Sequence, residues 1–123
     1  MQIHNFDELA IAHCVPCEAG TPSFPDNAID EQLKQLLGWS LSLDRKKIQK
    51  AWKVKNFISG LAFFQAVAEI AEAEDHHPDL HLEGYRNASI EIWTHTVNGL
   101  SQNDFILAAK IDQIDMARFT SRK

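Results

Sequence analysis

The chain has 123 residues, 45% of them hydrophobic and 24% charged, which is the balance of one ordinary globular domain. Its formal net charge of -5 argues against a nucleic-acid-binding surface, because such a surface needs clustered Lys and Arg to neutralise phosphates. No stretch approaches the roughly 20 apolar residues of a membrane span, and the first residues lack the basic and apolar regions of a signal peptide. We therefore expect a cytoplasmic protein with no nucleic-acid partner and no membrane partner.

The first 24 residues are expected to form an irregular arm, since Pro16, Gly20 and Pro22 interrupt any regular pattern there. The folded domain is then expected to cover residues 25–118, and a short tail is expected at 119–123. A single domain of this size has a small core, so association between copies would add to its stability.

The next elements are a short helix and a hairpin. Asp26 or Asn27 can cap an amphipathic helix that Gly38 ends. From Trp39 the hydrophobic period becomes two, and it continues at even spacing after a polar turn as far as Val54. This pattern predicts a β-hairpin with one buried face.

A longer helix is expected after Asn56, whose side chain can cap it. Its wide apolar stripe runs from Phe57 to Ala71, and alanines on several faces would permit close packing against the sheet or against another subunit. The helix should fail near Glu74, because Pro78 disfavours helical backbone in the residue before it. The wide apolar surface leads us to expect a homo-oligomer.

The second half of the chain is predicted to complete a sheet. Residues 79–84 can form a short strand, and residues 85–96 alternate apolar and polar side chains as a half-buried strand does. An Asn-Gly turn follows at 98–99, and Ser101 with Asp104 forms a capping box that opens the last helix. The expected fold class is α+β, a single domain with an antiparallel β-sheet of about four strands and three α-helices packed on one face.

The two cysteines, Cys14 and Cys17, form one C-x-x-C motif. A structural zinc site usually needs four ligands, and the chain has no second cysteine pair. A redox pair would normally open a helix after a strand, whereas Pro16 indicates an extended segment. Two reduced thiols without a catalytic role are therefore the simplest interpretation.

The stretch 72–81 concentrates groups that can carry chemistry. His76 and His77 precede Pro78 where the helix has just ended, and four of the six histidines lie between residues 76 and 95. Imidazole gives and takes protons near neutral pH, so such a cluster favours acid-base catalysis or metal ligation. The alternative is a set of solvated loop histidines.

This arrangement resembles the signature of the pterin-4a-carbinolamine dehydratase family. The signature has a charged residue, three residues, His-His-Pro, an aromatic residue, a histidine further on, and an aspartate. These positions are filled here by Glu72, His76, His77, Pro78, Tyr85, His95 and Asp104. Residues 14–18 also resemble the N-terminal arm of bacterial members, so the resemblance covers about residues 13–114.

The resemblance implies a dehydratase that removes water from a 4a-hydroxytetrahydropterin, gives the quinonoid dihydropterin, and serves the cofactor cycle of aromatic amino-acid hydroxylases. It implies no cofactor and no metal. The residues implied as catalytic are His76, His77 and His95, and those implied as substrate-binding are Glu72, Pro78 and Asp104. Of the latter, Glu72 and Asp104 would orient either the substrate or a histidine. Dimers joined through the sheet, or tetramers joined by helices, are also implied.

The chemistry is reasonable for imidazoles alone. One must protonate the leaving hydroxyl and another must accept the proton from N5, and each step contributes roughly 10²–10⁴-fold. That His77 is the acid and His95 the base is a hypothesis, because the sequence does not indicate which of the three histidines has which role.

Several site residues have a structural alternative. Asp104 can act as a helix cap only, Glu72 can be a solvated carboxylate at a helix end, and Tyr85 can be a strand aromatic that packs on its neighbour. His81 lies outside the signature and is expected to be an exposed loop residue.

Two other functions compete with the dehydratase. A metal-binding protein would use His76, His77, His81 and His95 with Asp79 or Glu83. Adjacent histidines on an irregular segment rarely point the same way, which weakens this hypothesis. A binding module without catalysis is the other, because some members of the family double as dimerisation cofactors of a homeodomain transcription factor.

Overall fold

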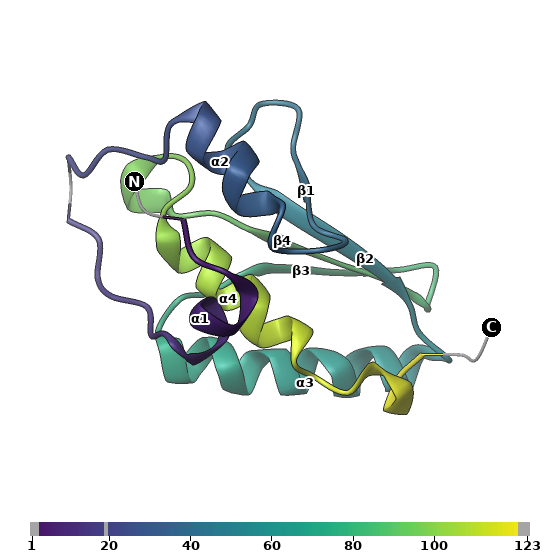
Figure 1. The fold of residues 1–123 in the computed structure, drawn as a ribbon. Coiled ribbons are helices and arrows are strands. Elements are labelled where there is room, and N and C mark those ends of the chain that lie inside the picture. Colours follow the sequence, from purple (N-terminus) through teal and green to yellow (C-terminus); the bar gives the residue numbers. More distant parts are fainter. Residues whose placement is uncertain (1–2, 19, 121–123) are drawn as a thin grey trace.

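A computed structural model describes residues 3–18 and 20–120, and its centre is a four-stranded antiparallel sheet (Figure 1). The strands are β1 (Ser40–Leu41), β2 (Ile48–Lys53), β3 (Asp79–Glu83) and β4 (Asn87–Ile92), in the order β1-β2-β4-β3. The α-helices are α1 (Phe6–Ile11), α2 (Asp26–Leu33), α3 (Phe57–Glu74) and α4 (Gln102–Asp112), and the short 3-10 helices are η1 (His95–Val97) and η2 (Met116–Arg118). The predicted α+β class and the sheet of four strands are confirmed.

The register of β2 against β4 separates an apolar face from a polar face. Ile48 pairs with Ile92, and both side chains are buried. Gln49 pairs with Glu91 on the opposite face, which the described helices leave open. The period of two in the sequence produces this separation, because successive side chains of a strand point to opposite faces.

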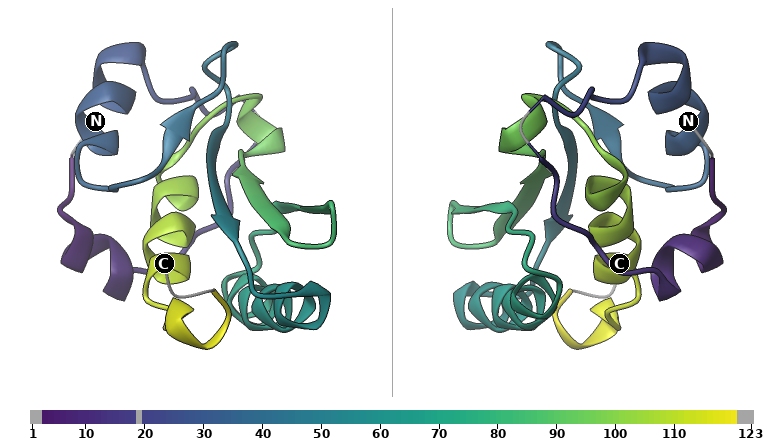
Figure 2. Two further views of the ribbon diagram at one scale, coloured as in Figure 1. Left: turned by 90° about the vertical axis from the view of Figure 1, so that its right-hand side faces the viewer. Right: turned by 90° about the vertical axis from the view of Figure 1, so that its left-hand side faces the viewer.

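The helices cover the apolar face. Figure 2 shows α2 and α4 on one side of the sheet, with α3 across its lower end. Every residue of α4 from Asn103 to Ala109 is buried, since the sheet, α1 and α3 surround this helix. Trp52 of β2 packs against Phe63 of α3, with 4.9 Å between ring centroids. α4 is therefore the centre of the core and is in contact with α1, α3 and β4.

The long helix α3 begins and ends where the sequence predicts. The Asn56 side chain accepts a hydrogen bond from the Ser59 amide at 2.8 Å and caps its start. At its end Asp75 has a left-handed backbone, φ 52°, and the His76 amide donates to the Ala71 carbonyl at 3.2 Å. This reversal sends the chain into β3. Among the described helices, none is apolar enough over a sufficient length to cross a membrane.

The N-terminal segment is not an irregular arm throughout, because it contains α1. Asn5 and Glu8 form a reciprocal capping box that starts this helix. Leu9 and Ala10 are buried, and Lys110 of α4 donates to the Ala10 carbonyl at 2.8 Å. α1, which adds a fourth helix to the three predicted, is therefore a packed part of the domain. Only the segment after α1 is extended.

The expected tail at 119–123 is also partly folded. Phe119 is buried, its ring centroid lies 5.8 Å from that of Phe63, and its carbonyl accepts a hydrogen bond from the Lys55 amide. Thr120 forms an antiparallel bridge with Val54. The core thus includes Phe119, and the rest of the expected tail, 121–123, lies outside the described residues.

Candidate active site

One end of the molecule holds a cavity of about 550 Å³ between the N-terminal segment, the α3–β3 junction and the end of β4. Its lining consists of Cys14, Val15, Pro16, Cys17, Glu74, Asp75, His76, His77, Pro78, Asp79, Trp93, Thr94, His95, Thr96 and Asn103. The three histidines and the proline named from the sequence therefore meet at one cavity, although 18 residues separate His77 from His95 along the chain. Glu72 and Asp104 do not line it.

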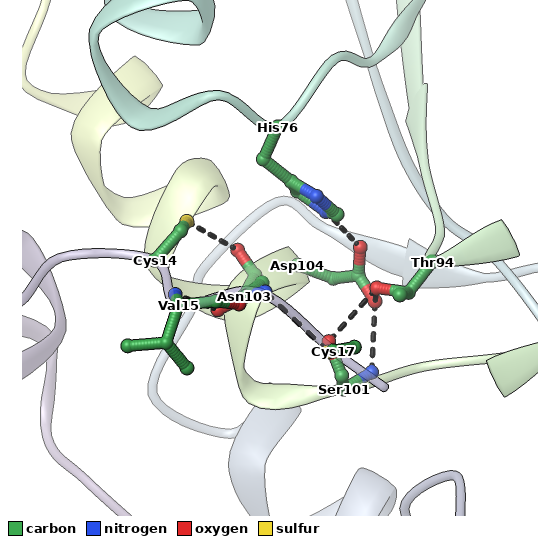
Figure 3. Close-up of polar contacts among 8 residues, drawn as sticks. All are labelled: Cys14, Val15, Cys17, His76, Thr94, Ser101, Asn103 and Asp104. Carbon is green, nitrogen blue, oxygen red and sulfur yellow. Dashed lines mark hydrogen bonds and ion pairs between the residues drawn. The ribbon is translucent and has the colours of Figure 1, made fainter. Parts of the chain in front are cut away.

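His76 is held by a buried carboxylate. Its Nε2 atom lies 2.7 Å from Oδ1 of Asp104, and only 12% of the His76 side chain is exposed. Figure 3 shows the imidazole pointing toward this carboxylate, with Thr94 and Ser101 on the far side. With the carboxylate as acceptor, Nε2 carries the hydrogen, which leaves Nδ1 as the nitrogen that can exchange a proton.

Asp104 accepts hydrogen bonds from two further groups. Its Oδ2 atom takes one from the Thr94 hydroxyl and one from the Ser101 amide, both at 2.8 Å. Burial raises the pKa of the Asp104 carboxyl above its usual value, while the bonds from His76, Ser101 and Thr94 act in the opposite direction. The predicted capping box of Ser101 and Asp104 is present, and the same carboxylate also orients His76.

His77 has an exposed partner in place of a buried one. Its Nε2 atom lies 2.7 Å from Oε2 of Glu72, and the two side chains are 55% and 77% exposed. Glu72 therefore contacts a histidine at the cavity from the last turn of α3, and is not itself part of the wall.

His95 is not on a strand as the alternation suggested, because β4 ends at Ile92 and His95 opens η1. The change follows from Asn98, whose left-handed backbone closes the short helix and lets Thr94 bridge to Gly99. The His95 ring stacks on Trp93, with 3.9 Å between ring centroids. The His95 side chain is exposed to solvent. Trp93 thus restricts the orientation of this imidazole.

Sequence reasoning missed the wall formed by residues 14–17 and its two contacts, Glu74 and Asn103. Both lie next to signature residues, Glu74 two positions before His76 and Asn103 directly before Asp104. No local pattern marks them, because their partners are 60 or more residues away.

Tyr85 and His81, which follow the His-His-Pro motif in the chain, do not line the cavity. Tyr85 sits in the β3–β4 turn with a positive φ of 59° and is 58% exposed, so the expected packing on a strand neighbour is wrong. His81, on β3, lies 3.4 Å from Glu91 on the open face of the sheet. Across residues 3–18 and 20–120, no three His, Cys, Asp or Glu side chains are grouped as metal ligands.

Comparison with known proteins identifies the family. The family model described as "Pterin 4 alpha carbinolamine dehydratase" matches residues 22–114. The chain belongs to the pterin-4a-carbinolamine dehydratase family. Members of this family are lyases, and the resemblance found in the sequence is confirmed.

Two curated members illustrate the likeness. The chain is 45% identical to "Pterin-4-alpha-carbinolamine dehydratase 2, mitochondrial" of Arabidopsis thaliana over 94% of its own length and 64% of that protein. It is 46% identical to a "Putative pterin-4-alpha-carbinolamine dehydratase" of Halorhodospira halophila over 82% of its length and 92% of that protein. The chain therefore spans somewhat under two thirds of the Arabidopsis protein.

A solved member of the family has the same fold. The crystal structure of a "transcriptional coactivator/pterin dehydratase" from Brucella melitensis matches with a TM-score of 0.68 and 29% identity. The match covers 73% of this chain and 95% of that one. The two proteins thus share the fold over about three quarters of this chain.

Proposed function

We propose that this protein dehydrates a 4a-hydroxytetrahydropterin to the quinonoid dihydropterin, and that His76, His77 and His95 do the proton transfer. The observation that carries the proposal is the meeting of these three imidazoles at one cavity of about 550 Å³. A cavity of this size suits a small bicyclic ligand.

The reaction requires two proton movements. The C4a–O bond breaks as the leaving oxygen receives a proton and departs as water, and the proton on N5 is lost as the C4a=N5 double bond forms. No electrons are exchanged with another molecule. Imidazole can serve as both acid and base near neutral pH, so the chain's own histidines are sufficient.

The contacts favour different roles for the three histidines. A carboxylate partner offsets the positive charge that an imidazole takes up with a second proton. Glu72 supplies such a partner to His77 at the cavity, which supports His77 as the acid. His95, whose ring is oriented by Trp93, is then the base, and His76, held at Nε2 by Asp104, keeps Nδ1 available as a third group for proton transfer.

Pro78 supports this arrangement as part of the wall. It lines the cavity directly after His77 and fixes the backbone before β3. Glu72 and Asp104 act through the histidines that they contact, which is one of the two roles expected of them.

The proposal is tested by generating the 4a-hydroxytetrahydropterin in the assay and following its loss with and without purified protein. A faster loss with wild-type protein and not with His77→Ala supports it. An unchanged rate with wild-type protein overturns it.

We also propose that the protein is a homo-oligomer, a dimer or tetramer. α3 leaves Phe57, Ile58 and Leu61 between 47% and 71% exposed, and such exposed large hydrophobic side chains on one helix are typical of a subunit contact. The role in recycling a hydroxylase cofactor and the cytoplasmic location stay predictions. The Arabidopsis relative is described as mitochondrial.

A second candidate function is a binding role without catalysis, favoured by the description of the Brucella protein as a coactivator as well as a dehydratase. The dehydration assay separates the two, because a binding module leaves the rate unchanged.

A further inference from the structure

We infer that residues 14–17 form a substrate-binding wall, which holds one face of the pterin ring against the histidines, and that Asn103 and Glu74 position this wall. The inference rests on the proposed function. Its starting point is that the family model begins at residue 22, whereas Cys14, Pro16 and Cys17 line the cavity. Part of the site is therefore built from a segment outside the matched domain.

Asn103 fixes the backbone of the wall from both sides. Its Oδ1 atom accepts a hydrogen bond from the Val15 amide at 3.0 Å, and its Nδ2 atom donates to the Val15 carbonyl at 2.6 Å. Figure 3 shows this segment beside the start of α4, close to the group around Asp104. An amide that pairs with both groups of one residue defines its orientation as well as its distance.

Glu74 holds the start of the wall, at Cys14. Its Oε1 atom accepts a hydrogen bond from the Cys14 amide at 2.7 Å, and its Oε2 atom lies 2.9 Å from Nδ1 of His13. Lys110 lies 3.6 Å away. Burial alone would raise the pKa of Glu74, but the bonds from Cys14 and His13 and the charge of Lys110 lower it below its usual value. The carboxylate is thus ionised at neutral pH.

The two positioning residues belong to the same elements as the histidine pocket. Asn103 precedes Asp104, which holds His76, and Glu74 lies in the last turn of α3 just before His76. The wall and the imidazoles are therefore held in a common frame. A ring bound at the histidines lies at the surface of residues 14–17 as well.

The surface of the wall suits the face of a heterocycle. Burial, together with the charge of Glu74, raises the pKa of the Cys14 thiol to about 12, so this thiol stays neutral. Sulfur makes favourable contacts with aromatic rings and the apolar prolyl ring can pack on them, whereas the polar groups of a pterin need partners such as imidazole. The wall therefore contributes affinity, and the histidines contribute the chemistry.

The test compares Asn103→Ala with Gln102→Ala, its neighbour on α4, which is not among the hydrogen-bond partners of the wall. We expect Asn103→Ala to raise KM about tenfold, because the wall loses three hydrogen bonds from the Asn103 amide, two to Val15 and one to Cys17, with kcat within about twofold. Gln102→Ala should keep both constants. A purely structural role of Asn103 would lower kcat and thermal stability and leave KM unchanged, and that result overturns the inference.

A second pair of variants tests the wall directly. Cys17→Trp places a bulky ring at the cavity, and Glu18→Trp places the same ring at an exposed position outside the lining. We expect the first to weaken binding of biopterin, a stable pterin, by about tenfold or more in calorimetry, and the second to leave it unchanged. Equal binding by Cys17→Trp and wild type overturns the inference, even if Asn103→Ala fails to fold.

Failure of the proposed function gives a different result. If wild-type protein binds biopterin but does not speed dehydration, the dehydratase proposal fails, while the dependence of binding on Cys17 still tests the wall.

Discussion

The adjacent histidines His76 and His77 each contact a carboxylate at the same distance, yet the surroundings of the two imidazole–carboxylate pairs differ. In each pair Nε2 of the histidine lies 2.7 Å from a carboxylate oxygen. His76 and Asp104 are 12% and 0% exposed, whereas His77 and Glu72 are 55% and 77% exposed. The comparison shows that a contact distance does not by itself indicate what a pair contributes to stability, because water screens the exposed pair.

The left-handed Asp75 explains why neighbouring histidines have such different partners. After this residue His76 turns inward to α4, and His77 turns back to the last turn of α3. The buried pair joins α4 to the α3–β3 junction through residues 28 positions apart in the chain. The exposed pair joins the last turn of α3 to the same junction through residues only five positions apart. We therefore expect the buried pair to matter for structure and rate, and the exposed pair for rate.

The largest expected effect is on turnover when an imidazole at the cavity is removed. His77→Ala and His95→Ala should each lower kcat by at least ~100-fold, the usual contribution of a general acid or base. Both side chains are exposed, so thermal unfolding should change little. Steady-state rates and circular dichroism check this, and wild-type rates in either variant would end the assignment of these histidines.

The next effect separates the two carboxylates. Asp104→Asn should lower the free energy of unfolding by about 1–3 kcal/mol, because it disturbs buried groups that accept or donate hydrogen bonds. It should also lower kcat by roughly tenfold or more, because His76 would lose its orientation.

Glu72→Gln is the matched control for Asp104→Asn. Its free energy of unfolding should stay within about 0.5 kcal/mol of wild type, because the pair that it weakens is exposed. Denaturant titration of both variants measures the difference. Equal destabilisation by the two substitutions would contradict the distinction between the pairs.

A smaller and more local change concerns assembly. Ala66 lies on α3, one turn beyond Ala62 and in line with the exposed Ile58. We expect Ala66→Glu to dissociate the oligomer by burying an unpaired charge at the contact. Sedimentation should give wild type at least twice the 13.9 kDa of one chain. A strictly monomeric wild type at micromolar concentration would refute oligomerisation, and would leave the catalytic assignment in place.

The smallest effect is expected from metal and thiol removal. Exhaustive chelation should leave kcat unchanged, and so should the double variant Cys14→Ser, Cys17→Ser, because neither thiol takes part in the proton transfer; the lost sulfur contacts of the wall would affect KM only. Activity lost on chelation and restored by zinc would instead favour a metal site.

Local signals were sufficient for most elements of the fold. The period of two predicts β2 and β4, and the caps at Asn56 and Ser101 predict the starts of α3 and α4. Each depends on residues within a few positions of one another, which is why one sequence reveals them. The capping box of Asn5 and Glu8 is an equally local signal for α1, which the expectation of an irregular arm did not take into account.

Contacts between distant segments could not be predicted in the same way. Phe119 is buried because α3 and β2 leave space beside Phe63, and no pattern near residue 119 records that space. The same holds for the bond between Val15 and Asn103, 88 residues apart. The histidines of the site were found through the signature, but the partners that distinguish His76 from His77 required the packed structure.

The most direct test of the account is the rate of loss of freshly generated 4a-hydroxytetrahydropterin in the presence of wild-type protein, His77→Ala and Glu72→Gln. We expect wild type to speed the loss, His77→Ala to retain about one hundredth of that effect or less, and Glu72→Gln to fall between them. A loss that is no faster with wild type than without protein would contradict the account.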